Sequence, residues 1–467
     1  MHISFHGAAK MVTGSKHILH LDDGRKILLD CGMFQGMGKQ TIDLNSDWGF
    51  DPASIDAVIL SHAHIDHSGL LPKLYKDGYR GPIYCTPATA ALATVLLEDS
   101  AQIQRDDARF YNKRRAKQGL PPVEPLYGVE DALSTAAQFV EHEYDKEFQV
   151  LDGVTCLFSD AGHIIGSASI HLSVQTNAGN RRVTFSGDIG RYRDDILRSP
   201  APFSQADYII VESTYGNSLH DEVHGTVEQL YNWIERTCIQ KKGKLIIPAF
   251  SVGRTQALLL ALNQLDLENR LHGIPVIVDS PLSKESTAII KQYPQYYNKR
   301  LRKLLLEDED PFDFKGLRFT ENSDESKALN DLQEPMIIIS ASGMADAGRI
   351  KHHIMNNIRN ANNTILIVGY CEPNSLGGKL MRGEKEVKIF GDVYQVSAEV
   401  GVMRAMSAHG DYDDLMQWLG CQHIPSVKEL FLVHGEEEVM LDFYMRLKRK
   451  GFHVTIPSLH AHYNLND

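Results

Sequence analysis

The stretch that decides the fold reads Ser61-His62-Ala63-His64-Ile65-Asp66-His67-Ser68-Gly69, a His-x-His-x-Asp-His pattern. It follows the short apolar run 57–60, which is typical of a buried strand. Alternate side chains of an extended segment point to one face, so His62 and His64 should share a face and chelate one ion. Asp66 and His67 come where the chain should turn, and they can reach a second ion. Imidazole with carboxylate suits zinc, and iron or manganese would also be accepted.

An accidental histidine-rich polar loop is the alternative interpretation of this stretch. Three histidines and an aspartate directly after an apolar strand are costly to bury in part without a partner, which favours a metal site. Two later strand ends offer further ligands: His163 lies between glycines after one apolar strand, and Asp188 ends the strand that begins near Arg182. Each is weak evidence alone, because histidine and aspartate are common where strands end.

Composition sets broad limits on the class of protein. The chain has 467 residues, 43% of them hydrophobic and 23% charged, which is ordinary for a soluble protein with room for two domains. No apolar run approaches the ~20 residues of a membrane span. The N-terminus reads as a strand and not as a signal peptide. The cysteines are far apart without a CxxC pair, which predicts reduced thiols and a cytoplasmic location. They are Cys31, Cys85, Cys156, Cys238, Cys371 and Cys421.

The pattern of elements changes after Asp188. The strand 207–212 is followed by alternating strands and helices whose continuous Ile, Val and Leu runs predict a buried, mainly parallel sheet. We therefore expect an α/β domain at 213–385 inserted into a first domain formed by 1–212 and 386–467. Residues 386–405 should resume the first domain's strands.

The His-x-His-x-Asp-His pattern resembles the signature of the metallo-β-lactamase superfamily. Three late features narrow the likeness: Glu212 after Val211, His409 in Ser-Ala-His-Gly-Asp, and His434 in Val-His-Gly. Together with the inserted domain they resemble the β-CASP group of nucleases, in a short bacterial form related to ribonuclease J and to the endonuclease of pre-mRNA 3′-end cleavage. The likeness covers nearly the whole chain. It implies an αββα sandwich that carries an inserted β-CASP domain.

The resemblance also implies roles for individual residues. One ion would be held by His62, His64 and His163, and the other by Asp66, His67 and His434, with Asp188 bridging both. The catalytic set would comprise Asp66 and Asp188 at the ions, His409 as the general acid and Glu212 as its orienting carboxylate. Asp30, at the end of the strand 26–30, would orient metal ligands by hydrogen bonds, or would serve only as a turn former.

Histidine at position 434 goes with RNA-processing members, so the resemblance implies RNA as the substrate, and we expect that RNA to be single-stranded. The net charge of −12 argues against a broad basic surface but not against a nucleic-acid substrate. Loops that could present backbone N–H groups to phosphates include the candidates Arg254, Ser340, Ser342, Gly343, Ser375 and Gly377, although such loops are equally typical of ordinary strand-to-helix turns. A DNA nuclease, an ester or thioester hydrolase and a non-catalytic RNA-binding subunit are the competing functions. The sequence predicts no oligomeric state.

Overall fold

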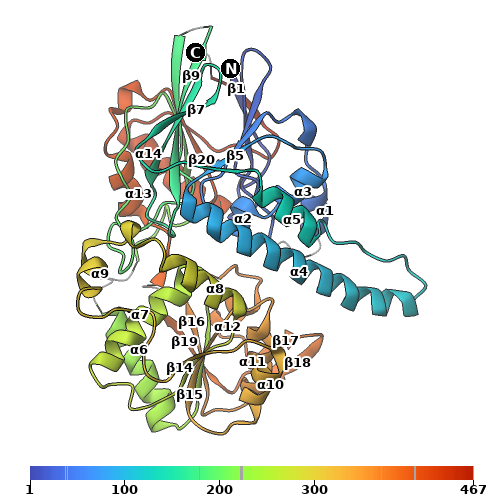
Figure 1. Cartoon of the computed structure of the whole chain (residues 1–467), viewed down its shortest axis with the longest axis vertical. Coiled ribbons are helices and arrows are strands. Elements are labelled where there is room, and N and C mark those ends of the chain that lie inside the picture. The colour runs from blue at the N-terminus through green and yellow to red at the C-terminus, as the bar shows by residue number, and fades with distance from the viewer. Residues whose placement is uncertain are drawn as a thin grey trace. The chain divides into compact units, whose positions relative to one another are not determined.

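The computed structural model describes residues 1–36, 38, 40–177, 179–220, 225–369, 371–403 and 406–465. The chain divides into two compact units (Figure 1). The first unit comprises Met1–Tyr192, Arg198–Leu219 and His409–Asp467, and the second comprises Arg193–Leu197 and His220–Ala408. Among the described residues, no helix has the length and apolar character that crossing a membrane requires.

The first unit is a sandwich of two sheets, each with seven strands within the described part of the chain. One sheet has the order β22-β1-β2-β3-β4-β5-β6, and the other has the order β21-β20-β11-β10-β9-β8-β7. Their inner faces meet through aromatic side chains, with the rings of Phe5 and Phe431 5.2 Å apart. The strands of the first sheet are β1 His2–Phe5, β2 His17–His20, β3 Lys26–Leu29, β4 Ala57–Ile59, β5 Ile83–Cys85, β6 Phe139–Glu141 and β22 His462–Asn464. Those of the second are β7 Glu147–Leu151, β8 Val154–Asp160, β9 Ala168–Thr176, β10 Gly179–Phe185, β11 Tyr208–Glu212, β20 Glu429–Val433 and β21 Val454–Thr455.

Helices cover the outer faces of this sandwich (Figure 1). Trp418 on α13 and Phe443 on α14 are fully buried against strands of the second sheet. Thr86 caps the long helix α4 as the sequence indicates, because its hydroxyl accepts from Thr89 N, and Asp411 caps α13 in the same way. The helices are α1 Gln40–Ser46, α2 Ile65–Ser68, α3 Leu71–Lys76, α4 Pro87–Lys117, α5 Val129–Ala136, α13 Tyr412–Leu419 and α14 Glu437–Lys450.

The second unit is built on a six-stranded sheet, counted over the described residues, with the order β14-β13-β15-β12-β16-β19 and parallel pairing throughout. Its central strands are buried along their whole length, which explains their continuous Ile and Val runs. The strands are β12 Lys244–Pro248, β13 Val276–Val278, β14 Leu317–Phe319, β15 Met336–Ser340, β16 Thr364–Val368 and β19 Glu399–Met403, with a separate hairpin of β17 Glu386–Ile389 and β18 Asp392–Gln395. The helices are α6 Thr226–Ile234, α7 Arg254–Leu267, α8 Pro281–Ile290, α9 Lys299–Leu304, α10 Ser323–Asp331, α11 Arg349–Asn357 and α12 Leu376–Met381.

The predicted fold class, a sandwich with an inserted α/β domain, is confirmed, but the borders of the insertion differ from 213–385. Residues 213–219 belong to the first unit, and 193–197 belong to the second. The assignment of 386–405 to the sandwich is corrected. β19 pairs with β16 residue for residue, and Val387 and Ile389 pack into the second unit's core. The alternating pattern of this segment fits an edge strand and a hairpin as well as it fits a sandwich strand. Ala405 lies outside the described residues.

The second sheet of the sandwich contains neighbouring strands that come from before and after the insertion in the chain. Strand β11 ends at Glu212, before the insertion, and pairs in parallel with β20, which begins at Glu429. Tyr208 lies opposite Glu429, and Glu212 lies opposite Val433. This pairing therefore joins strands more than 200 positions apart in the chain.

Candidate metal and catalytic centre

The His-x-His-x-Asp-His stretch lies beyond the strand, not on it. Strand β4 ends at Ile59, close to the end of the apolar run 57–60, and His62 and His64 occupy the following loop, where their rings lie together. His64 precedes the short helix α2, and its carbonyl accepts from His67 N at 2.9 Å. This turn brings His67 back toward His62, with their ring centroids 4.1 Å apart.

Three imidazoles and one carboxylate form the first group of candidate ligands. The Nδ1 atom of His64 lies 3.2 Å from His62 Nε2 and 3.1 Å from His163 Nε2. Asp188 Oδ2 lies 3.5 Å from both Nε2 atoms. Nitrogens bound to one tetrahedral zinc ion are roughly 3.4 Å apart, because each Zn–N bond is ≈ 2.0–2.1 Å. The donor set therefore has the spacing that one ion of this kind requires.

Burial holds imidazoles of the first group in the neutral form that binds metals. It lowers the pKa of His64 to about 4, and it lowers the pKa of His62 well below its ordinary value. A neutral imidazole offers one nitrogen lone pair, and these lone pairs converge on the same point. A cation bound at that point would satisfy these buried lone pairs.

The second group comprises Asp66, His67 and His434. His434 Nε2 lies 3.3 Å from His67 Nε2 and 3.5 Å from Asp66 Oδ2. Asp188 joins this group through its other oxygen, since Oδ1 lies 3.2 Å from His67 Nε2. One buried carboxylate thus presents one oxygen to each histidine group, which is the arrangement of a bridging ligand between two ions.

Hydrogen bonds from Asp30 and Ser61 set which nitrogen of each ring faces the centre. The Asp30 carboxylate accepts from Ser61 N at 2.7 Å, from Ser61 Oγ at 2.8 Å and from His67 Nδ1 at 2.6 Å. Since Ser61 Oγ donates to Asp30, it accepts from His62 Nδ1 at 3.0 Å. Both rings then present Nε2 as the lone pair. Asp30 also has a φ of 57° directly after β3, so it forms a turn as well as bonding Ser61 and His67.

Thr214 holds His434 in the same manner, and the sequence analysis missed it. Its hydroxyl lies 3.2 Å from the His434 carbonyl, to which it donates, and 3.1 Å from His434 Nδ1, from which it accepts. This leaves Nε2 of His434 directed at Asp66 and His67. Thr214 and Ser61 are hydroxyl residues beside strand ends, with no spacing that marks them in the sequence.

A histidine–carboxylate pair lies directly beside these two groups. His409 Nδ1 is 3.2 Å and 3.3 Å from the two oxygens of Glu212 and 3.9 Å from Asp188 Oδ2. Glu212 is fully buried at the end of β11, where its Oε1 accepts from Ile189 N at 2.6 Å. Burial by itself lowers the pKa of His409, but Glu212 and Asp188 outweigh it and raise the pKa to about 9. The arrangement gives an imidazole that carries a proton.

The predicted substrate-contacting residues all lie in the second unit, and the structure gives several of them structural contacts. Ser340 is buried and donates to Asp279 O at 2.8 Å. Ser375 caps α12, and Arg254 begins α7 with its guanidinium donating to Val368 O.

Two of the remaining candidates are glycines at close approaches. A Cβ on Gly377 would lie 2.7 Å from Cys371 Sγ, and one on Gly343 would lie 2.5 Å from the Phe250 ring. Packing explains both glycines without a substrate. Ser342 is half-buried. Contact with substrate stays a prediction for all six candidate residues of the second unit.

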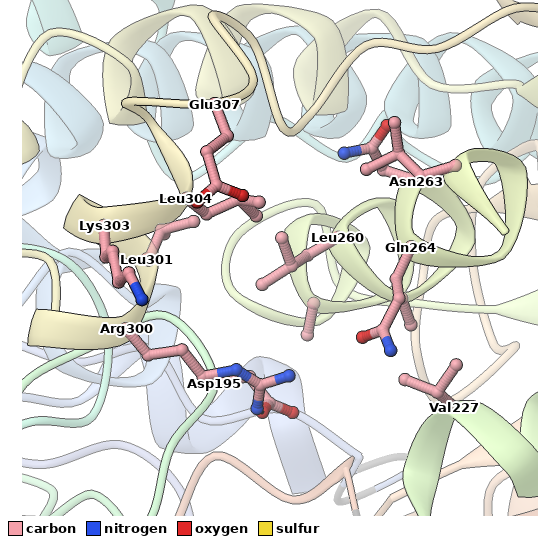
Figure 2. A pocket seen from close by; sticks show the side chains of 13 residues that line it. Asp195, Val227, Leu260, Asn263, Gln264, Arg300, Leu301, Lys303, Leu304 and Glu307 are labelled. Carbon is pink, nitrogen blue, oxygen red and sulfur yellow. The ribbon is translucent and has the colours of Figure 1, made fainter.

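A cavity of about 310 Å³ lies within the second unit, between α7 and α9 (Figure 2). Leu260 and Leu304 supply apolar wall, and Arg300 pairs with Asp195 at 2.9 Å on one side. Its lining contains none of the candidate metal ligands. This cavity is therefore separate from the candidate metal and catalytic centre.

The sandwich with two ligand groups at its strand ends and a His–Glu pair beside them defines a metallo-hydrolase of the metallo-β-lactamase type. The Metallo-beta-lactamase superfamily model matches residues 18–249, the Beta-Casp domain model matches 255–380, and the model of the Zn-dependent metallo-hydrolase RNA specificity domain matches 393–457. The chain belongs to the β-CASP family of this superfamily, as the sequence predicts. The metallo-β-lactamase fold implies divalent metal binding, and the His/Asp groups are the candidate ligands.

Characterised relatives resemble the chain over nearly its full length. It is 35% identical to Ribonuclease TTHA0252 of Thermus thermophilus, over 96% of each chain. It is 30% identical to the RNase J-like protein of Methanocaldococcus jannaschii over 95% of each, and 29% identical to Transcription termination factor FttA of Methanosarcina mazei over 95% of this chain and 68% of that one. A crystal structure of a protein of unknown function from Enterococcus faecalis shares the fold, with TM-score 0.52, 11% identity and 99% coverage of both chains.

Proposed function

We propose that this protein is a metal-dependent ribonuclease that hydrolyses phosphodiester bonds in RNA. The observation that carries the proposal is the position of Asp188, with one oxygen toward each histidine group and the proton-bearing His409 3.9 Å away. Relatives of nearly equal length that are named ribonuclease and RNase J-like support the choice of RNA, as does the match to an RNA specificity domain.

The ligand sets divide into two ion sites. His62, His64 and His163 would hold one ion, Asp66, His67 and His434 would hold the other, and Asp188 would contribute to both. When bound, two divalent ions supply Lewis acidity toward the phosphodiester and positive charge against its oxygens. Zinc is the ion we propose, because five of the seven ligands are imidazoles at tetrahedral spacing, although manganese or iron also accepts carboxylate ligands.

His409 supplies the proton for the leaving oxygen. Its Nδ1 is engaged by Glu212, so its Nε2 is the nitrogen that meets the substrate. Glu212 orients the ring and favours the charged imidazolium, which then donates its proton as the P–O bond breaks. Glu212 accepts backbone N–H bonds from Ile189 and Thr214, so the carboxylate itself is held in place. These contacts make Glu212 a positioning residue and His409 the general acid.

We propose single-stranded RNA as the substrate and the cytoplasm as the compartment. Bases of single strands can be splayed and read, whereas an A-form duplex hides its major groove. All six cysteines are free thiols and five of them are buried, which suits a reducing compartment.

Incubation with 5′-labelled single-stranded RNA, with and without a chelator, tests the function. We expect cleavage that the chelator abolishes and that added zinc restores. DNA and a thioester substrate, tested in parallel, serve as controls for the competing hydrolase classes. Absence of metal-dependent RNA cleavage, or faster turnover of the thioester, would overturn the proposal.

His163→Ala tests the division of ligands between the two sites. We expect this variant to lose one of the two ions, measured by elemental analysis, and to lose cleavage with it. Two fully retained ions would contradict the assignment. His423→Ala, which removes an exposed histidine of the first unit that belongs to none of the ligand groups, is the matched control.

A further inference from the structure

A second group of histidines lies outside the catalytic centre, on the first sheet of the sandwich. It comprises His2, His20 and His462, and it is one of the groups of three or more potential metal ligands in the described residues. It shares no residue with the ligand sets above. His20 is half-buried and His462 is exposed, so a dissolved ion can reach the group.

Strand register brings these three side chains to one face of the sheet. His2 lies directly opposite His20 across the antiparallel pair β1–β2. His462 lies opposite Ser4, two residues from His2, on the edge strand β22. Since residues i and i+2 share a face, His2, Ser4 and the two facing histidines all point the same way. Phe5 points to the opposite face, where it meets Phe431 in the core, so the histidines face away from the second sheet.

The rings are close enough for one ion. The rings of His2 and His20 stack with centroids 4.1 Å apart, and the His462 centroid lies 5.7 Å from His2 and 5.9 Å from His20. One nitrogen from each ring can be chosen so that all three lie within 4.8 Å of one another. A tetrahedral zinc ion needs roughly 3.4 Å between nitrogens, which small side-chain rotations would provide.

Ser4 already orients the half-buried ligand. Its hydroxyl lies 2.8 Å from His20 Nε2 and 2.9 Å from His6 Nε2, and His6 Nδ1 lies 3.0 Å from His460 Nδ1. A hydroxyl has one proton, so it accepts from one ring and donates to the other. When His20 Nε2–H donates to Ser4, Ser4 donates to His6 and His6 Nδ1–H donates to His460. When the hydrogen bonds run in this direction, the lone pair of His20 is on Nδ1 and Nε2–H is the donor. A metal-binding histidine usually donates its other ring N–H to an acceptor in this way.

Charges of both signs act on this group. The carboxylate of Asp22 lies near enough to act on His2. Two positive charges also act on His2: the N-terminal ammonium of Met1, which pairs with Asp22, and the ammonium of Lys26, which bonds Ser54 Oγ at 2.9 Å.

We propose that His2, His20 and His462 form a surface site for a divalent transition-metal ion, zinc or the more tightly held copper, that is distinct from the catalytic pair. Three imidazoles with one open position suit these ions and do not suit magnesium or calcium. A bound ion would connect the edge strand β22 to β1 and β2.

The test uses the protein with its catalytic sites filled. Zinc is added in equilibrium dialysis, and bound metal is counted by mass spectrometry. We expect one more ion than the catalytic pair in the wild type, and a loss of affinity for that ion by ~10–100-fold or more in His20→Gln and His462→Gln. RNA cleavage should be unchanged in both variants. His423→Gln, an exposed histidine outside both centres, is the control.

Copper gives an independent readout. Cu²⁺ added to the same zinc-filled protein should give an electron paramagnetic resonance spectrum with coupling to several nitrogens, and His462→Gln should reduce that number. His462 is exposed, so its replacement leaves the fold intact. A wild type that binds no ion beyond the catalytic pair, or variants that bind it as tightly as the wild type, would overturn the proposal.

Discussion

At the scale of single residues, the contacts of His409 separate chemistry from metal binding. It contacts Glu212 and lies beside Asp188, but it belongs to neither histidine group. His409→Ala should therefore keep both ions and bind RNA, while cleavage falls by ~10²–10⁴-fold, the usual contribution of a positioned proton donor. Single-turnover cleavage and elemental analysis on the same sample check this. Loss of an ion would make His409 a ligand.

A substrate with a better leaving group distinguishes proton donation from RNA positioning. A 3′-bridging phosphorothiolate needs little protonation, so His409→Ala should recover most of its lost rate on it. Glu212→Gln should show a milder form of both effects, because the ring stays but its orientation and charge are less well supported. Equal slowing on both substrates would place the proton donor elsewhere.

Thr214 should act through His434. Thr214→Val keeps the shape of the side chain but removes the hydroxyl that holds Nδ1 of the ring. We expect metal affinity at the second ion site to fall by ~10–100-fold, as for other residues that orient metal ligands. Competition with a chelator of known affinity measures this. Thr94→Val, which removes a hydroxyl bonded to Ala90 O within α4, should leave the affinity unchanged.

The sequence identifies those candidate metal ligands whose residue types seldom occur together within a short stretch. His62, His64 and His67 form a dense pattern, and the structure brings them together with His163, Asp188 and His434 as predicted, although their function as ligands stays a prediction. Thr214 and Ser61 could not be found, because a hydroxyl beside a strand end is common and its partner is far away in the sequence. Ser340 and Ser375 show the reverse, since their glycine-rich surroundings indicated substrate contact and the structure gives them backbone partners.

At the scale of elements, close backbone contacts hold the ligand loops. A Cβ on Gly190 would lie 1.8 Å from Gly162 O and 2.6 Å from His163 N. Gly190→Ala should therefore displace the loop that carries His163, destabilise the fold by ~1–3 kcal/mol and weaken the first ion site. Denaturant unfolding and metal analysis check this. Gly128→Ala, where the nearest atom is an Asp131 oxygen 3.8 Å away, is the control. Equal metal content in the two variants would contradict the expectation.

Elements with strong local signals were predicted well, and those that depend on partners were not. Helix α4 has Thr86 as a cap and proline at its first position, and it begins there as predicted. Strand β19 was assigned to the wrong unit, because an alternating strand does not reveal which sheet edge it joins. The loop that holds His62 and His64 follows the predicted strand, but distant residues set its path. Ser61 N donates to the Asp30 carboxylate and Ser15 N donates to the Asp66 carbonyl, and no local pattern reveals either bond.

At the scale of the whole molecule, all of the candidate catalytic ligands belong to the first unit. Metal removal should therefore loosen that unit and leave the second one unchanged. Hydrogen exchange should accelerate on chelation at 61–68, 162–166, 186–190 and 432–436, where buried charged and polar groups lose their shared cation. Strands β12, β15 and β16 should exchange at the same rate with and without metal. Equal acceleration in both units would contradict this division.

The pairing of β11 with β20 has a consequence for protein synthesis. Ribosomes make the chain from its N-terminus, so Glu212 emerges long before the strand it pairs with and before His409 and His434. A partly translated chain can gather the early histidines, but it has neither the proton donor nor the last ligand. We expect ribosome-bound chains that end at Ala408, before both late histidines, to be inert toward RNA, so that the messenger RNA under translation is not cleaved by its own product. Cleavage by such arrested chains, purified on their ribosomes, would show that the late strand is dispensable.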